Sequence, residues 1–409
     1  MNKKEVKKAP ILRFKGFTND WEQRKLGTAI KIIKDKNKNQ HSYRAFSISN
    51  IKGFIAQDEQ FGKDNTYSKT DKSTNYIVKP GMFAYNPARI NVGSIAYQNQ
   101  TEPVLVSSLY EIFQTNSKID DSFLMNWFKT SLFNRQIKRL EEGGVRQYFF
   151  IDKMKETEIK LPSISEQNQI SKLLQLVNKN LDLQQRKLEL LKLFKIGMLQ
   201  NILADTKAAS KLKFKGSNQE WRPRRLNSIT NIITKGTTPH FKQASNGVNF
   251  IKIEDISKDN GKIYPRSFIT EKENNGYLKR SQLKAGDLLF SIAGTLGRVG
   301  KVTDDILPAN TNQALAIIRL KPSQNIDFCK IMLESDSVKR YIHANPTMGA
   351  QPNLSLKQIS DLTLFFPDIK EQTLISQLIK KIDNLLALQY QNISKFKQLK
   401  QFLLQNIFI

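Results

Sequence analysis

The sequence predicts an α+β protein of two tandem, mostly β domains, each followed by a long helix. The two helices are expected to form an antiparallel coiled coil, giving the chain a pseudo-twofold internal repeat. Three observations lead to this fold class. The chain of 409 residues is too long for one ordinary core and suits two domains. The segment FKGFTNDWEQRKL (14–26) returns as FKGSNQEWRPRRL (214–226). The last segment of each half also carries an apolar heptad pattern.

The repeat covers almost the whole chain. Its opening matches at an offset of 200 residues and includes Trp21 with Trp221, which we interpret as packing residues of a shared frame. Its closing part matches at an offset of 205, where residues 143–170 lie over 348–375. A unit of this size is typical of a tandem of two domains rather than of a solenoid. We therefore place a first domain at 1–165, a helix at 166–204, a second domain at 205–369 and a second helix at 370–409.

The start of each long helix has a clear signal. Pro162 and Pro367 stop the preceding strand, and Ser163 or Asp368 supplies the N-terminal cap of the helix. From these caps, apolar residues recur at alternating spacings of three and four over roughly 38 residues, which indicates a heptad seam in each half.

The two seams match position by position. Their apolar members are Leu174, Val177, Leu181, Leu188 and Leu191 in the first helix, and Ile379, Ile382, Leu386, Ile393 and Phe396 in the second. Their polar members are Gln184 with Gln389 and Lys195 with Lys400. Polar seam positions weaken a coiled coil but fix its register and partner. Pairing within one chain is the simpler arrangement, and pairing of each helix with another subunit is the alternative.

The middles of the two halves do not match. Residues 27–80 and 227–285 share little beyond short β-branched runs broken by Gly, Asn and Asp turns, which predicts mostly β modules. Residues 123–140 and 327–342 have helical spacing at equivalent places and are each predicted as a helix. Similar ends with different middles indicate one architecture that carries two different binding surfaces.

The charge points to a polyanionic partner. The chain has 65 Lys plus Arg and 37 Asp plus Glu, which gives a formal net charge of +28. Such self-repulsion favours nucleic acid as the partner, and the basic residues extend over both halves. An anionic membrane is disfavoured, because the sequence has no amphipathic helix with a basic face and aromatic anchors.

Metal and disulfide chemistry are not expected. Cys329 is the only cysteine, so an internal disulfide and a thiolate zinc site are excluded. The histidines His41, His240 and His343 are far apart and lack ligand spacing. No apolar run approaches the roughly 20 residues of a membrane span, and we expect a cytoplasmic protein.

On several motifs together, the sequence resembles the specificity subunits of type I DNA restriction–modification systems. The motifs are W-x-x-R-[KR]-L at Trp21 and Trp221, the phrase LKAGDLLFSIAGTLGRVGKV (283–302), the segments GVRQ and GAQPNLS, and the P-x-x-x-E-Q helix starts. Their order, found twice, is the specific feature. In the first half, MFAYNPARINVGSIAY (82–97) replaces the 283–302 phrase, which we interpret as another subtype of recognition domain.

The resemblance implies two target-recognition domains held apart by an antiparallel helix pair. Each domain would read one half of a split, asymmetric site on double-stranded DNA, and the helices would set the unread spacer. The chain would dock two methyltransferase subunits and two restriction/translocase subunits. It would be non-catalytic and hold no cofactor, with S-adenosylmethionine, ATP and Mg on the partners.

The residues themselves show no catalytic constellation. Residues 86–89 (NPAR) only partly match the Asn/Asp-Pro-Pro-aromatic loop of an adenine methyltransferase, and residues 294–300 lack the spacing of a cofactor glycine loop. Carboxylate neighbours such as Glu254 and Asp255 have no catalytic lysine at a recognisable spacing. Two alternatives stay open: an accessory nuclease subunit of a single-chain restriction system, and a nonspecific architectural DNA-binding protein.

Candidate DNA contacts are Arg, Lys, Asn, Gln, Ser, Thr or Tyr residues on presenting segments. In the first domain they are Lys34, Lys36, Arg44, Ser47, Arg89, Asn91, Arg146, Gln147 and Tyr148. In the second domain they are Lys235, Thr237, Thr238, Lys252, Ser291, Thr295, Arg298, Gln351 and Asn353.

Overall fold

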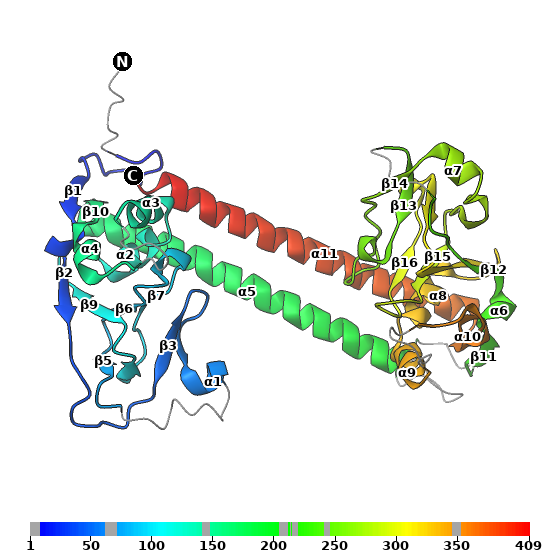
Figure 1. The fold of residues 1–409 in the computed structure, drawn as a ribbon, viewed down its shortest axis with the longest axis horizontal. Helices are drawn as coiled ribbons and strands as arrows, with labels where there is room; N and C mark the ends of the chain where they lie inside the picture. Colours follow the sequence, from blue (N-terminus) through cyan, green and yellow to red (C-terminus); the bar gives the residue numbers. More distant parts are fainter. Residues whose placement is uncertain are drawn as a thin grey trace, which may run out of the picture. The chain divides into compact units, whose positions relative to one another are not determined.

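The computed structural model divides the chain into two compact units (Figure 1). The first comprises residues 1–185 and 391–409, and the second comprises residues 186–390. The structure describes residues 9–61, 72–140, 148–203, 212, 214, 220–240, 246–345 and 353–409. Each unit holds one mostly β domain and part of each long helix, as the predicted fold class requires.

The repeated opening segment forms the same strand pair in both units. In the first unit, β1 (Glu22–Lys25) pairs antiparallel with β10 (Glu158–Leu161). In the second, β11 (Arg222–Arg225) pairs antiparallel with β19 (Thr363–Phe366). The two matched ends of each half are therefore hydrogen-bonded to each other, so both must be kept for the domain to close.

The unlike middles contain the same four-stranded sheet. Its strand order is β2-β9-β6-β7 in the first unit and β12-β18-β15-β16 in the second. The strands are β2 (Ile30–Ile33), β6 (Phe83–Tyr85), β7 (Ile95–Tyr97), β9 (Glu111–Thr115), β12 (Thr230–Lys235), β15 (Leu288–Ser291), β16 (Val299–Lys301) and β18 (Leu315–Leu320). Residues 82–97 thus occupy the place of residues 287–302, although the two segments read differently.

The units differ in their smaller sheets. The first unit adds the antiparallel pairs β3 (Phe46–Ser49) with β4 (Gly53–Ala56) and β5 (Tyr76–Val78) with β8 (Val104–Val106). The second adds β14-β13-β17, in which β13 (Val248–Ile251) pairs antiparallel with β14 (Phe268–Ile269) and parallel with β17 (Ala309–Thr311). The difference between the two halves is therefore concentrated in these additions and their loops.

Short helices complete both domains. They are α1 (Gln57–Phe61), α4 (Ile151–Glu156), α6 (Leu226–Ile229), α7 (Glu271–Asn275) and α10 (Leu356–Asp361), with 3-10 turns η1 (Leu26–Thr28), η3 (Ile90–Val92), η4 (Ile253–Asp255), η5 (Lys279–Ser281) and η6 (Asp304–Ile306).

The helices predicted at 123–140 and 327–342 are each broken in two. The first becomes α2 (Asp121–Trp127) and α3 (Ser131–Leu140), and the second becomes α8 (Ile326–Leu333) and α9 (Asp336–Ala344). The reason is a polar cap at each break. The hydroxyl of Thr130 accepts from the backbone N–H of Phe133, and that of Ser335 accepts from the N–H of Val338. Such residues favour helix starts over helix interiors.

Trp21 and Trp221 are packing residues, as predicted. Both are buried, Trp21 at 5% exposure. Trp21 meets Phe123 edge-on with ring centroids 6.0 Å apart, and Trp221 meets Phe328 in the same way at 5.7 Å. Trp21 therefore packs the strand pair β1–β10 against α2, and Trp221 packs the strand pair β11–β19 against α8.

The long helices have the expected lengths and caps. Helix α5 runs from Ile164 to Ile202 and α11 from Ile369 to Asn406, 39 and 38 residues. The hydroxyl of Ser163 accepts from the N–H of Glu166 at 3.3 Å. The carboxylate of Asp368 accepts from the N–H of Glu371 at 2.9 Å.

The two helices contact each other within each unit. All ten predicted apolar seam residues are buried or half-buried. In the first unit, Leu174 shares a core with Leu403 and Ile407 of α11. In the second unit, the Lys195 ammonium lies 2.6 Å from an Asp383 carboxylate oxygen. A continuous coiled coil along both helices stays a prediction.

Each unit is closed by the same contact between a domain start and a helix end. The backbone N–H of Leu12 donates to the carbonyl of Asn406 at 3.1 Å. The N–H of Leu212 donates to the carbonyl of Asn201 at 2.9 Å. Asn201 and Asn406 are equivalent positions, because they lie 205 residues apart. The start of the first domain therefore contacts the end of α11 in the same way as the start of the second domain contacts the end of α5.

Candidate nucleic-acid interface

In the first domain, most of the predicted contacts that the structure describes are exposed. Lys34 and Lys36 follow β2, and Arg89 and Asn91 flank the start of η3. Ser47 is half-buried on β3. Exposed cations and an exposed amide on loops are suited to phosphate contacts and to base edges.

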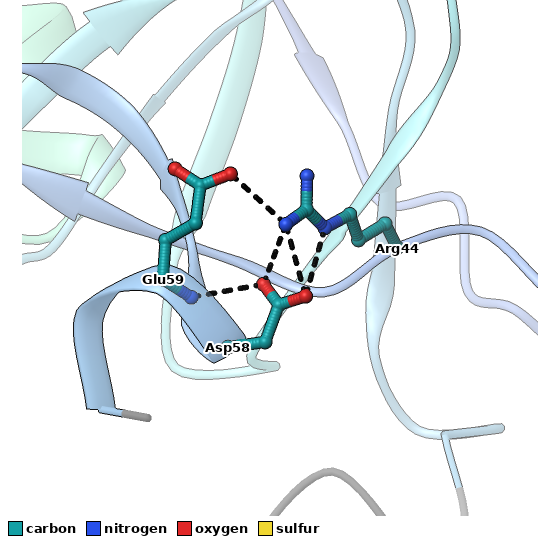
Figure 2. A network of polar contacts seen from close by, with 3 residues as sticks. All are labelled: Arg44, Asp58 and Glu59. Carbon is teal, nitrogen blue, oxygen red and sulfur yellow. Dashed lines mark hydrogen bonds and ion pairs between the residues drawn. The ribbon is translucent and has the colours of Figure 1, made fainter. Parts of the chain in front are cut away.

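Arg44 is exposed, but its charge is already engaged (Figure 2). Its guanidinium lies 2.8 Å from Asp58 and 2.9 Å from Glu59. The hydrogen bond from Arg44 lowers the pKa of the Asp58 carboxyl, so the pair is ionised at neutral pH. Contact between Arg44 and a phosphate would require an exchange of partners, which marks this arginine as a weaker candidate than Arg89.

An aromatic pair adds a candidate that sequence reasoning missed. The ring of Tyr148 is stacked on that of Phe150, with centroids 5.4 Å apart and planes at 8°. Phe150 is 46% exposed, which is unusual for this side chain. An exposed Phe150 ring stacked on the half-buried ring of Tyr148 is suited to base stacking. The signal was the run Tyr-Phe-Phe at 148–150. The neighbouring candidates Arg146 and Gln147 lie outside the described residues.

In the second domain, one group of candidates lies at the end of β12 and just after it. Lys235 and Thr238 are exposed and Thr237 is half-buried. The hydroxyl of Thr238 donates to the side-chain oxygen of Gln313 at 2.6 Å. This bond joins the segment after β12 to the loop before β18. Lys235, the last residue of β12, lies next to this segment in the chain.

The loop after β15 divides its candidates into support and surface. Ser291 has no exposed surface, and its hydroxyl donates to the Thr295 carbonyl and accepts from the Arg298 N–H. The Arg298 guanidinium donates inward to the carbonyls of Ile253 and Ile256. The Ser291 hydroxyl is thus engaged within its own loop and the Arg298 guanidinium with the η4 segment, and a direct DNA contact by either residue stays a prediction. Thr295 is exposed at its tip.

The remaining second-domain candidates have backbone roles or lie outside the described residues. Lys252 is half-buried at the start of η4, where its N–H donates to the Asp255 carboxylate at 2.8 Å. Asn353 is exposed and forms an isolated β-bridge with Ala293. Gln351 lies outside the described residues.

Metal-ligand and thiol chemistry have no support among the described residues. Within the described ranges, no group of three or more His, Cys, Asp or Glu side chains is placed to hold a metal ion. Burial raises the pKa of the Cys329 thiol to about 12, which keeps it protonated and a poor nucleophile. No helix in the part of the chain that the structure describes has the length and apolar character of a membrane span.

The two domains share one frame, differ in their added strands and loops, and both carry exposed cations. The sequence model of the type I restriction modification DNA specificity domain matches the chain twice, at residues 18–193 and 218–398. The chain therefore belongs to the family of type I restriction–modification specificity subunits.

Among its relatives is the type I restriction enzyme MjaVIII specificity subunit of Methanocaldococcus jannaschii. The two are 24% identical over 399 residues, which cover 93% of this chain and 90% of that protein. The EcoBI specificity subunit of Escherichia coli is 26% identical over 175 residues, which cover 41% of this chain and 35% of that protein.

Solved structures share the fold. A chain from a study of complex assembly and conformational transition of the type I R-M system has a TM-score of 0.61 at 15% identity and covers 95% of this chain. It is itself covered over 97% of its length. The S subunit from M. genitalium has a TM-score of 0.58 at 14% identity, with 98% of this chain and 99% of that chain covered. The HsdS subunit from Thermoanaerobacter tengcongensis has a TM-score of 0.51 at 16% identity, with 95% and 96% covered.

Proposed function

We propose that this chain reads a bipartite, asymmetric DNA site, with one recognition domain for each half-site, as the non-catalytic specificity subunit of a type I restriction–modification enzyme. The observation that carries the proposal is the combination of a shared frame with unlike additions. Both domains have the same four-stranded sheet order, but they add different small sheets and loops. Identical readers would match a palindrome, whereas unlike readers suit two unlike half-sites.

The long helices support the docking of partner subunits. Leu176, Leu183 and Leu190 of α5 lie seven residues apart on one helix face and are 58%, 54% and 58% exposed. Such a repeated leucine stripe is costly in water and suits a partner helix. We assign this face to the methyltransferase subunits. S-adenosylmethionine, ATP and Mg belong on those and the restriction subunits, and the complex acts in the cytoplasm.

The test is a domain exchange followed by methylation mapping. Residues 30–157 are replaced by the corresponding segment of another specificity subunit, and the complex with methyltransferase subunits is assayed by single-molecule sequencing of methylated DNA. We expect one half of the methylated site to change and the other half to persist. A change in both halves would refute the assignment of one domain to each half-site.

The non-catalytic role has a separate test. The purified chain alone is incubated with DNA and S-adenosylmethionine, and with DNA, ATP and Mg. We expect neither methylation nor cleavage until the partner subunits are added. Turnover by the chain alone would contradict the proposed role.

Leu183→Lys should prevent co-purification of the methyltransferase subunit, whereas exposed Lys187→Gln on the same helix should not.

A further inference from the structure

The first unit contains a polar cleft that includes only one of the predicted DNA contacts, Asn91. Its volume is about 890 Å³, and its lining residues come from the tip of the β3–β4 hairpin, the segment around η3 and β7, helix α2 and helix α11. The polar residues that matter here are Asn50, Lys52, Asn91, Lys129, Asn134 and Lys400. Neutral amides beside lysines are typical phosphate ligands.

Two lysines of this cleft repel each other. Lys129 follows α2 and Lys400 lies on α11, so tertiary folding brings them together. The Lys129 residue is exposed to solvent, but partial desolvation by the surrounding protein, and then the positive charge of Lys400, lower its pKa. Neither ammonium group forms a hydrogen bond or ion pair with another described residue. An anion bound between them would remove this repulsion.

The one carboxylate that lines the cleft among the described residues has other partners. Asp121 accepts a hydrogen bond from the hydroxyl of Thr115. Burial, and then the neighbouring Asp121 carboxylate, raise the pKa of the Tyr97 hydroxyl to about 12. No ion pair joins Asp121 to Lys129 or Lys400 within the described part of the chain. The cleft therefore lacks an internal counterion for its two lysines.

The second unit shows what a balanced version of the same place looks like. At the offset of 205, Lys400 corresponds to Lys195, Lys129 to Glu334, and Asn178 to Asp383. In the second unit Lys195 is paired with Asp383 at 2.6 Å.

Glu334 completes the contrast, because it is paired with Lys330 at 2.7 Å. The three equivalent positions carry two positive charges and no negative one in the first unit, and one positive and two negative charges in the second. The charge is reversed between Lys129 and Glu334. Lys400 lacks the carboxylate partner that Asp383 provides for Lys195, because Asn178 stands at the equivalent position. This asymmetry indicates a ligand for the first cleft alone.

We propose that Lys129 and Lys400 bind a backbone phosphate of the DNA duplex in this cleft, and that the equivalent place in the second unit binds none. The inference rests on the proposed function and adds to it a phosphate anchor on one side only. A phosphate is favoured over a protein carboxylate because the amides of Asn50, Asn91 and Asn134 add donors that its several oxygens accept.

The test uses the full chain in complex with its methyltransferase subunits and a duplex that carries the site found by methylation mapping. The dissociation constant is measured over a range of salt concentrations for the wild type and for K129Q/K400Q. Loss of one phosphate contact should lower the slope of log K against log salt by about one, and affinity at 0.15 M salt by about fivefold. The preference for the correct site over a mismatched one should not change, because a phosphate contact carries no sequence information.

A second variant adds a counterion instead of removing a cation. N178D places a carboxylate at the position equivalent to Asp383, where it should pair with Lys400 and reduce the slope without removing a lysine. E334Q, at the equivalent of Lys129 in the second unit, is the matched control and should leave the slope unchanged. Circular dichroism spectra and melting temperatures verify that the variants fold.

The outcomes separate the possibilities. A reduced slope in K129Q/K400Q and N178D, but not in E334Q, supports the phosphate site. An unchanged slope in both variants overturns it. If the slope is unchanged and the methyltransferase subunits fail to co-purify, the cleft holds an acidic segment of a partner and the DNA assignment is wrong. A wild-type complex that binds random duplexes as well as the mapped site would instead refute the proposed function itself.

Discussion

Replacement of Trp21 tests whether the repeated tryptophan holds the frame or contacts DNA. Trp21→Ala removes a buried ring that packs edge-on against Phe123, and a loss of this kind costs about 3–5 kcal/mol. Trp21→Phe should cost far less. The smaller ring leaves a void of roughly 40 Å³, or about 1 kcal/mol. It also removes an indole N–H that is buried without an acceptor among the described residues, which offsets part of that cost.

The assay is hydrogen exchange measured by mass spectrometry on the strand pair that Trp21 supports. Amides of β1 and β10 should exchange at least about a hundredfold faster in Trp21→Ala and change little in Trp21→Phe. The pair β11 with β19 in the second unit serves as the internal reference, because Trp221 is unchanged. DNA affinity of Trp21→Phe should equal that of the wild type.

The reasoning is refuted by the opposite pattern. If Trp21→Phe weakens DNA binding while exchange at β1 and β10 is unchanged, the ring contacts bases and the frame does not depend on it.

Three further perturbations follow from particular contacts. Arg13 donates at 2.8 and 2.9 Å to the carboxylate of Glu166, which is 1% exposed. R13M leaves this carboxylate unpaired and should lower the free energy of unfolding by about 3–5 kcal/mol, measured by urea unfolding. R13M/E166Q should lower it much less, because no unpaired charge remains. Equal losses in the single and double variants would contradict this. The Cys329 thiol has a pKa raised to about 12, so iodoacetamide should not label the folded chain at pH 8.5. The protonated thiol should contribute fully to the free energy of unfolding below pH 8.5. That contribution should decrease as the pH rises toward 12, because the thiol of the unfolded chain ionises first. Labelling of the folded chain without denaturant would show that the thiol is not buried. A circular permutant opened within residues 204–211, with its original ends joined by a short linker, keeps both closing contacts and should methylate the same site; failure to assemble would show that those contacts are insufficient.

Much of the frame could be predicted from the sequence because its signals are local and occur twice. The prolines and caps before α5 and α11 act within a few residues, and the heptads depend only on spacing. The matched tryptophans indicated a shared packing role. The positions of Thr130 and Ser335 were also local signals, but apolar spacing on both sides favoured one continuous helix over two.

The candidate site was less predictable because it depends on partners that are distant in the chain. Arg44 has the sequence signature of a free cation, although Asp58 and Glu59 lie beside it, and Ser291 has that of a loop hydroxyl, although it is buried. Residue type alone does not distinguish a side chain that supports a loop from one that faces solvent. Phe150 escaped prediction for the converse reason, since an aromatic residue is expected to be buried.

The sequence by itself determined the duplication, the two long helices and the packing role of the repeated tryptophans, since each leaves a signal within one segment or between segments at a fixed offset. The order of motifs placed residues 82–97 where the second half has 283–302, but only the tertiary structure decided that both segments form the same two strands of a four-stranded sheet. Strand pairing needs backbone hydrogen bonds and alternating burial, which many sequences satisfy. It also decided that Lys129 and Lys400 share a cleft without a counterion, because that charge balance exists only where separate elements meet.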